Sequence, residues 1–269
     1  MSIEMKKTYD DLWFRFGYAT HSDDNFREFQ LTWFLKRFGL DSHSFHEIID
    51  GKTVLEVGTG SGAFLRNLII AKAAYGLDQS EAGTDIARQV YYKDHKNIHI
   101  ITEDLMKHGG QYDVVIADQV LHHLPDTYKA LEKTVSLVTP GGVIMFYVYK
   151  KKVPVREFVD TFLRWFTTRL SQKNCLLFSE FMLWLGKTLT RINLPLQRWV
   201  YWNIAKCFYN ETFSHDNNLR VNYDWYSPKI AHRHTEEEAH LWIKKLNITP
   251  DHINIGDSGI SVRAHVGIS

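Results

Sequence analysis

The sequence predicts an α/β fold, a mostly parallel seven-stranded sheet with helices on both faces. From Lys52 onward, short β-rich runs alternate with helix-like segments, the pattern that produces parallel strands joined by crossover helices. A long helix-like segment interrupts this series after the fifth strand. Near the end of the chain, two alternating runs surround Asp257-Ser258-Gly259, which predicts a closing hairpin with an antiparallel C-terminal strand.

Each element follows from its local pattern. The expected strands are residues 53–57, 73–77, 98–102, 112–117, 143–149, 248–255 and 259–266. The expected helices of this part are residues 62–70, 81–94, 128–137 and 235–246. Thr235, followed three residues later by Glu238, forms the capping box that begins the last helix. The sequence Thr139-Pro140-Gly141-Gly142 predicts a turn before the fifth strand.

Two predicted helical segments flank the sheet in the sequence. Residues 1–50 form an N-terminal extension, because Phe26, Trp33 and Phe34 recur at helical spacing behind a cap at Asp23 or Asp24. Residues 150–225 form a helical lid. The core is then residues 51–149 together with 226–269.

The charge of the chain is balanced overall but not locally. Its 269 residues carry a formal net charge of +1, which gives no reason to expect nucleic acid as a partner. Residues 150–210, however, contain 11 Lys or Arg against 3 Asp or Glu. This surplus fits a solvated face, attraction for an acidic substrate, or contact with a membrane surface or nucleic acid.

The cysteines and the start of the sequence predict a cytoplasmic protein. Cys175 and Cys207 are too few for a disulfide framework and lack metal-ligand spacing, so we expect free thiols. His232-x-His234 is weak evidence for a metal, and we expect no metal site. Residues 1–11 are charged and lack the apolar core of a signal peptide. The oligomeric state is not indicated.

A glycine-rich loop follows the first predicted strand. Gly58, Gly60 and Gly62 allow a tight turn and let a ligand approach bare backbone, and a helix beginning there offers free N–H groups. Asp78 ends the next strand, where an acid accepts hydrogen bonds from ribose hydroxyls. The spacing Gly58-x-Gly60-x-x-Ala63 also fits a dinucleotide site, so a nicotinamide-dependent oxidoreductase remains an alternative.

Five motifs in order give residues 52–149 a resemblance to class I S-adenosylmethionine-dependent methyltransferases. They are Glu56 with the glycine loop, Asp78-Gln79-Ser80, Glu103-Asp104-Leu105, Tyr112–Asp118 running into Gln119–Leu124, and Leu137–Val143. The resemblance implies a Rossmann-like sheet, S-adenosyl-L-methionine as the cofactor and S-adenosyl-L-homocysteine as the product.

The resemblance also implies a role for each matched position. Glu56 would orient the loop and the ammonium group, while the loop itself, Thr59 included, would lie along the methionine part. Asp78, with Gln79 beside it, would hold the ribose. The remaining cofactor residues would be Asp104 at the adenine amino group, Leu105 on the adenine ring, and Asp118 and Gln119 at the methionine end.

Methyl transfer mainly requires that a nucleophile be positioned and water excluded. His122 and His123 follow the fourth strand at the ligand-binding end of the sheet, and a histidine there can act as a general base. We consider both as catalytic residues, His123 first. The alternative is that one of them packs beneath the site.

The methyl acceptor is predicted to be a small molecule, methylated at oxygen or nitrogen. The fourth motif continues Asp118-Gln119-Val120-Leu121, unlike that of enzymes that methylate nucleic-acid amino groups, and no Pro-Cys pair is present. Residues 223–228 and 232–234 are the candidate acceptor contacts, with Tyr226 and His234 foremost, although His234 could instead cap the following helix. A lipid or membrane-associated acceptor and a cofactor-binding protein without catalysis are the other possibilities.

Overall fold

A mixed seven-stranded sheet forms the centre of the protein, whose computed structural model describes residues 3–92 and 95–267. The strands lie in the order β3-β2-β1-β4-β5-β7-β6. Their bounds are β1 (Thr53–Val57), β2 (Ala73–Asp78), β3 (Ile98–Thr102), β4 (Tyr112–Ala117), β5 (Val138–Tyr149), β6 (Ile248–Ile255) and β7 (Gly259–Val266). Among these strands, β7 pairs antiparallel with both β5 and β6, and the other pairings are parallel, which confirms the predicted fold class.

The order of the strands reverses direction next to β1. The chain passes from β1 outward to β2 and β3, then returns to place β4 on the other side of β1. Glu56 pairs with Gly76 of β2 and Ile116 of β4, so the carboxyl ends of all three strands lie together. Ligands of open α/β sheets bind in the crevice at such a reversal. This topology therefore gathers the loops after β1, β2 and β4 at one place.

Alternating side chains of the strands supply two hydrophobic cores. Leu55 and Val115 face one side, against α6 (Thr127–Ser136) and α11 (Glu236–Lys245). Val54 faces the other side, against the last two helices of the N-terminal extension, α3 (Asp24–Arg37) and α4 (Ser42–Ile49). The extension begins with α1 (Ile3–Phe16) and α2 (Ala19–Ser22). Burial on both faces explains why the central strands are continuously apolar.

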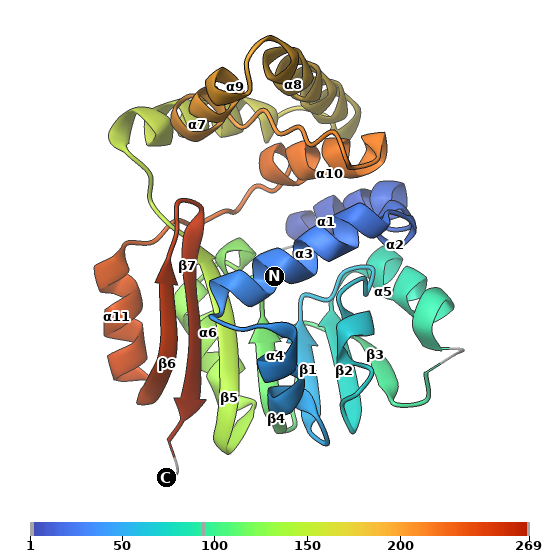
Figure 1. Cartoon of the computed structure of the whole chain (residues 1–269), viewed down its shortest axis with the longest axis vertical. Helices are drawn as coiled ribbons and strands as arrows, with labels where there is room; N and C mark the ends of the chain where they lie inside the picture. The colour runs from blue at the N-terminus through green and yellow to red at the C-terminus, as the bar shows by residue number, and fades with distance from the viewer. Residues whose placement is uncertain (1–2, 93–94, 268–269) are drawn as a thin grey trace.

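The segment after β5 forms a separate helical layer above the sheet. Its helices are α7 (Pro154–Thr167), α8 (Gln172–Ile192), α9 (Leu194–Asn203) and α10 (His215–Tyr226). Figure 1 shows α1 and α3 between this layer and the sheet. A third hydrophobic core joins Leu12 and Phe16 of α1 to Met182 of α8 and Tyr223 of α10. The helical insertion is thus confirmed, while its division from the core as a domain stays a prediction.

Buried polar side chains attach α7 to α10 and to the segments that follow α9 and α10. Arg164 donates hydrogen bonds to the carbonyl oxygens of Trp225 and Pro228, and Arg156 donates to that of Ile204. Asp160 accepts from the indole N–H of Trp225. Buried charged groups need such partners, because burial without them is costly. Among the described helices, none has the length and apolar character needed to cross a membrane.

The predicted helix over residues 62–70 is wrong. Only a short 3₁₀ turn, η1 (Leu65–Leu68), forms there. The hydrogen bonds span three residues, as from the Asn67 amide to the Phe64 carbonyl, and the Asn67 side chain donates to the same carbonyl. This local bonding satisfies the backbone without an α-helix. The anion-binding helix terminus expected after Gly62 is therefore absent from this described segment.

Two further elements differ in extent. The second predicted helix divides into α5 (Glu81–Ala87) and a π-helical turn, η2 (Arg88–Tyr92), while its expected end at residues 93–94 lies outside the described residues. β5 begins at Val138, before the predicted turn, and its pairing with β4 shifts between Tyr112 and Val114. Gly141, with φ of 78°, allows this irregularity.

Both predicted helix caps are present. Thr235 and Glu238 form the capping box of α11. The Asp23 carboxylate accepts from the Phe26 amide at the start of α3. It also accepts from the Ser214 amide at 2.7 Å and the Asn217 side chain at 3.0 Å, next to α10. Asp23 therefore links the N-terminal extension to the inserted helices.

We predict that Asp23→Ala lowers the free energy of unfolding by about 2–4 kcal/mol, because three hydrogen bonds to one buried carboxylate are lost. Urea denaturation monitored by circular dichroism measures this. Asp24→Ala at the exposed neighbouring position is the matched control and should cost less than about 0.5 kcal/mol. Equal losses in the two variants would contradict the linking role.

Candidate functional site

Three glycines in left-handed conformations shape the loop after β1. Gly58, Gly60 and Gly62 have φ angles of 78°, 54° and 80°. A Cβ atom on Gly58 would lie 2.6 Å from Val120, and one on Gly60 would lie 2.2 Å from Trp13. Other residues would therefore meet both backbone strain and steric overlap at these positions. The loop keeps bare backbone against its surroundings, as the sequence predicts.

Two carboxylates, the buried Glu56 and the half-buried Asp78, face this loop. Asp78 accepts from the Gly60 amide at 2.9 Å and from the Ser80 amide at 2.8 Å. Glu56 accepts from the Thr59 hydroxyl at 2.7 Å. Burial raises the pKa of Asp78, and it raises the pKa of Glu56 to about 8, with Asp118 and Asp78 adding to the rise. A cation placed between these groups would be favoured.

The first two helices cover the loop through residues that the sequence analysis did not identify. Trp13 packs on Gly60 and Gly83. Asp10 accepts from the Ser80 hydroxyl at 2.7 Å, and Thr20 lies 2.9 Å from the Ser61 hydroxyl. No motif marks these contacts, because they join segments about 40–70 residues apart. Their only signal is the aromatic content of the N-terminal extension.

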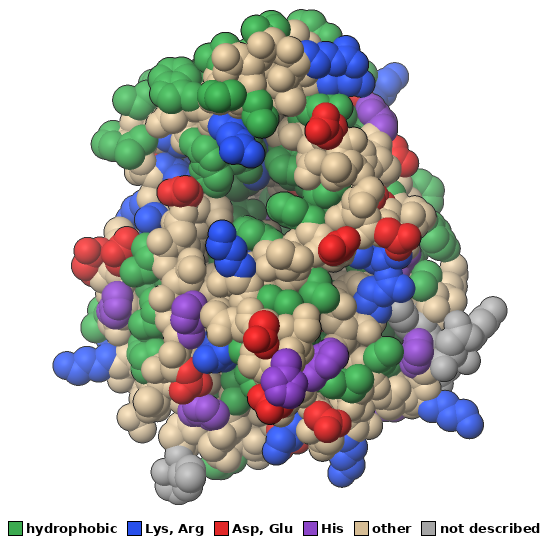
Figure 2. Space-filling view, in the orientation of Figure 1, with side chains coloured by type: hydrophobic (Ala, Val, Ile, Leu, Met, Phe, Trp, Pro, Cys, Tyr) green, Lys and Arg blue, Asp and Glu red, His purple; other side chains and the backbone are tan. Residues whose placement is uncertain are grey.

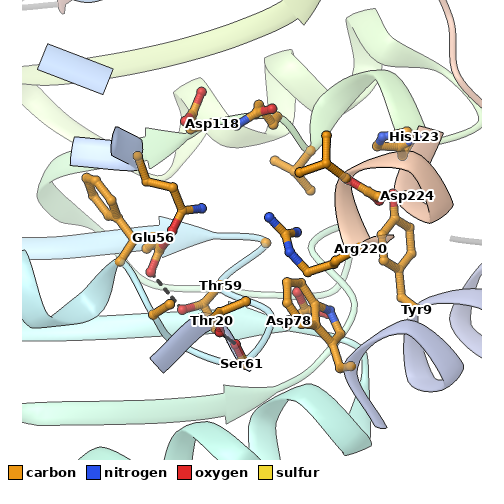
Figure 3. A pocket seen from close by; sticks show the side chains of 18 of the residues that line it. Tyr9, Thr20, Glu56, Thr59, Ser61, Asp78, Asp118, His123, Arg220 and Asp224 are labelled. Atoms are coloured by element: carbon orange, nitrogen blue, oxygen red, sulfur yellow. Dashed lines mark hydrogen bonds between the residues drawn. The ribbon is translucent and has the colours of Figure 1, made fainter. Parts of the chain in front are cut away.

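Three cavities lie in a row, and Gly58 of the loop lines the first and the third. The first has a volume of about 210 Å³ and is lined by Glu56, Gly58, Asp78, Asp118 and His123, among others. Figure 3 shows Glu56 and Thr59 on one side of it, His123 and Asp224 on the other, and Arg220 between them. Its lining joins the glycine loop to α10.

The second cavity is larger and lies beneath the inserted helices. Its volume is about 500 Å³. It shares Gln119, Tyr149, Lys206, Arg220 and Trp225 with the first cavity, so the two are adjacent. Figure 2 shows the molecule hollowed below these helices, with hydrophobic side chains in the hollow.

The third cavity is small, about 30 Å³, and lies on the other side of Asp78 and Gly58. Gln79, Glu103, Asp104 and Leu105 line it, so the structure brings the residues of the second and third motifs together here. The side-chain nitrogen of Gln79 is buried without a hydrogen-bond partner among the described residues. An amide left in this state is suited to a ligand that supplies an acceptor.

Asp118 lines the first cavity but is already paired. Both of its oxygens accept from the Arg37 guanidinium, at 2.9 and 2.8 Å. Arg37 lies 3.6 Å from the centre of the Trp33 ring. A bidentate pair of this kind fixes the carboxylate and partly neutralises its charge. Gln119, which lines the first and second cavities, has an uncommon φ of 58°.

The two histidines have different surroundings. His123 lines the first cavity, and its Nδ1 lies 2.7 Å from the Ile230 carbonyl oxygen. A carbonyl only accepts, so Nδ1 carries the proton and Nε2 keeps its lone pair. Burial lowers the pKa of His123 to about 4, which keeps the ring neutral near pH 7.

His122 lies outside the three cavities. Its ring is fully buried and stacks on Tyr149, with the ring centres 3.6 Å apart. Burial lowers its pKa well below the usual range. The structure therefore favours the packing alternative for His122.

The two candidate acceptor residues also lie outside these cavities. Tyr226 is fully buried among the inserted helices and donates to the Lys206 carbonyl. His234 contacts the Thr127 hydroxyl at 3.1 Å, next to α11. Asp224 and Trp225 line the first cavity instead. A step of one residue turns an α-helix by about 100°, so Tyr226 points away from the side of α10 on which Asp224 lies.

Comparison with known proteins identifies a family. A methyltransferase domain family matches residues 42–217. The ubiquinone biosynthesis O-methyltransferase of Shewanella pealeana is 31% identical over 120 residues, which is 43% of this chain and 50% of that protein. The corresponding protein of Shewanella halifaxensis is 32% identical over 122 residues, with the same coverage. The chain thus spans about half the length of the curated relatives it matches.

Solved structures share the fold at low sequence identity. Magnesium protoporphyrin IX methyltransferase of Synechocystis PCC 6803, with bound S-adenosylmethionine, aligns with a TM-score of 0.52 at 12% identity, over 98% of both chains. The N-methyltransferase NodS of Bradyrhizobium japonicum WM9, with bound S-adenosylhomocysteine, aligns with a TM-score of 0.52 at 14% identity, over 96% of this chain and 98% of that one. These similarities bear on the fold alone.

The raised pKa of Glu56 predicts a pH dependence of stability. The ordinary pKa is 4.5 and the folded value is about 8, so between these values the folded state holds a proton that the unfolded state releases. The free energy of unfolding should therefore fall as pH rises through this window. Glu56→Gln should reduce this fall, as measured by urea denaturation at several pH values. Glu132→Gln, at an exposed position, is the control, and an unchanged slope in Glu56→Gln would contradict the burial argument.

Proposed function

Since this chain belongs to the methyltransferase domain family, we propose that it transfers a methyl group from S-adenosylmethionine to a small-molecule acceptor at oxygen or nitrogen. The observation that carries the proposal is the row of three adjacent cavities, with Asp78 and Gly58 between the first and the third. A cofactor with two ends would cross the glycine loop at this point. The acceptor would then approach from the second cavity.

The residues present fit the cofactor. Asp78 retains lone pairs for ribose hydroxyls while it accepts from Gly60 and Ser80. Gln79 and Asp104 would meet the adenosine end, and Leu105 would pack on the adenine ring. Glu56 would lie at the methionine end, where an ammonium would lower its raised pKa and favour the carboxylate. Because the third cavity is small, binding would require Val120 to move away from Gly58.

S-adenosylmethionine supplies a methyl group on a positively charged sulfur. When bound, it would offer this methyl group to a lone pair of the acceptor oxygen or nitrogen. His123 Nε2 would take the acceptor's proton, since its lone pair is available at the first cavity. Trp13 and Tyr9, which also line this cavity, would help to exclude water.

The second cavity supports an apolar or aromatic acceptor that carries an acidic group. Aromatic side chains dominate its lining, among them Phe26, Trp33, Tyr149, Tyr201, Phe208 and Trp225. Arg198, Lys206 and Arg220 are its basic residues. A pocket with apolar walls and a few charged groups orients a ligand of this kind. A cytoplasmic location is also part of the proposal, supported by the free thiols of Cys175 and Cys207.

The cofactor assignment predicts selective binding. Calorimetric titration should give micromolar binding of S-adenosylhomocysteine and none of NADH. Asp78→Ala should weaken that binding by about 1–3 kcal/mol, because charge-assisted hydrogen bonds are lost. Asp85→Ala, on the solvent side of α5, is the matched control and should bind normally. NADH binding without S-adenosylhomocysteine binding would instead indicate a nicotinamide site.

The base assignment predicts a loss of turnover without a loss of cofactor affinity. Transfer of a radioactive methyl group from S-adenosylmethionine to a panel of hydroxylated aromatic acids, neutral phenols and aromatic amines identifies an acceptor. With the acceptor so identified, His123→Ala should lower kcat about 100-fold and leave the Kd of S-adenosylhomocysteine nearly unchanged. His232→Ala, which lies outside the described cavities, is the control. Full activity of His123→Ala would exclude the base role, and cofactor binding without transfer to any acceptor would favour a binding protein.

A further inference from the structure

The inserted helices expose an unusual amount of hydrophobic surface. Of the large hydrophobic side chains exposed in the described part of the chain, more than half belong to residues 153–202. They are Val153, Val155, Phe158, Phe162, Trp165, Phe166, Leu177, Phe181, Trp184, Ile192, Leu194, Leu196, Trp199 and Trp202. We call this set the outer patch. So many exposed hydrophobic side chains in one segment of a protein usually mark an interaction site.

Helix α7 has its polarity reversed relative to an ordinary surface helix. Arg156, Asp160 and Arg164, spaced four residues apart, are buried and bonded to the layer beneath. Phe158 and Phe162, on the opposite side, are 74% and 58% exposed. Surface helices normally turn their apolar side inward. The polar side of α7 has partners within the chain, whereas its apolar side has solvent.

Helix α8 continues the pattern and adds charge. Leu177, Phe181 and Trp184 are exposed at helical spacing, and Lys173 and Arg191 are exposed on the same stripe at its two ends. Figure 2 shows hydrophobic side chains over the top of the molecule, with Lys and Arg beside them. Aromatic rings in the middle and cations at the ends are the composition of helices that lie at a lipid interface.

Exposed basic side chains lie on the same helices as the outer patch. The exposed basic side chains of α7–α9 and the turn after α7 are Arg169, Lys173, Lys187, Arg191 and Arg198. None of them forms an ion pair with a carboxylate in residues 3–92 or 95–267. Glu180, the acidic residue of α8, is paired with His215. The surface is therefore apolar and cationic at once.

We propose that the outer patch docks this protein on a lipid bilayer that contains anionic phospholipid. The aromatic rings of α7 and α8 would enter the boundary between headgroups and acyl chains, and the unpaired cations would contact lipid phosphates. A second copy of this chain fits less well, because two such surfaces would bring like charges together. Anionic lipid complements both the apolar and the cationic character of the patch.

The patch borders the second cavity. Leu194, Arg198 and Trp202 of α9 are exposed and also line that cavity. A molecule dissolved in the bilayer would thus meet the cavity at the docked face. The docking itself does not depend on the proposed methyl transfer, since the residues of the outer patch on α7 and α8 line none of the three cavities.

Co-sedimentation with vesicles tests the proposal on the full-length chain. The vesicles are phosphatidylcholine alone or phosphatidylcholine with phosphatidylglycerol, in low and high salt. The patch variant is Phe158→Ser/Phe162→Ser/Phe181→Ser/Trp184→Ser, and its matched control is Phe14→Ser/Leu241→Ser, at exposed hydrophobic positions elsewhere. The charge variant is Lys173→Gln/Lys187→Gln/Arg191→Gln, with Lys36→Gln/Lys72→Gln/Lys244→Gln as its control at exposed positions.

The wild-type chain should bind the phosphatidylglycerol vesicles at least about tenfold more strongly than pure phosphatidylcholine, and less strongly in high salt. The patch and charge variants should each lose about tenfold or more in binding, while both controls bind as the wild type does. Circular dichroism checks that all variants fold. If either the patch variant or the charge variant fails to fold, the other still tests the proposal against its own control.

Three results would overturn the proposal. The wild-type chain could remain in the supernatant with the anionic vesicles, or the controls could lose as much binding as their matched variants. Sedimentation velocity could also show a dimer that the patch variant converts to a monomer, without vesicle binding. That last result would assign the outer patch to a second copy of the chain.

Discussion

The hydrogen bonds accepted by the Asp78 carboxylate are the interaction on which the rest of this structure depends. They join the loop after β1, through the Gly60 amide, to the end of β2, through the Ser80 amide. Trp13 of α1 packs on Gly60. Asp11, also of α1, accepts a hydrogen bond from the Tyr223 hydroxyl of α10 at 2.6 Å. The N-terminal helices and the inserted helices are thus positioned from one strand end, so loop, cavity and cover form a single assembly.

The inserted helices bury polar side chains and expose apolar ones, which is the reverse of ordinary surface helices. Their inner and outer surfaces therefore differ in character. On the inner side, Arg156 and Arg164 satisfy backbone carbonyls that helix α9 and the turn after α10 leave open. Arg156 also forms an ion pair with Asp160 at 3.8 Å, so its buried charge has both a carbonyl and a carboxylate as partners. On the outer side, exposed aromatic residues stack on one another, as in the pairs Phe162–Trp165 and Phe181–Trp184, and turn the rest of their surface to solvent. The same segment can therefore cover an aromatic cavity and present an apolar, cationic face.

Sequence patterns predicted the seven strands closely, because strand periodicity, turn residues and caps are local properties. The predicted helix over residues 62–70 is absent although the cause is also local. The Asn67 side chain donates to the Phe64 carbonyl within a three-residue turn, a bond that helical periodicity does not reveal. At the site, the motif residues converge as their positions at strand ends require. Tyr226 and His122 did not reach the cavities, because the direction of a side chain depends on helix rotation and packing that adjacent residues in the sequence do not reveal.

The sequence by itself determined the seven strands, the glycine loop and the acids at the ends of β1 and β2, because each depends on short-range patterns of residues. Only the tertiary structure decided what surrounds that loop. Trp13, Arg220 and Asp224 reach the first cavity through contacts between segments up to about 200 residues apart. The tertiary structure also decided which side of α7 faces inward, because the buried arginines donate to carbonyl oxygens that only folding brings beneath them.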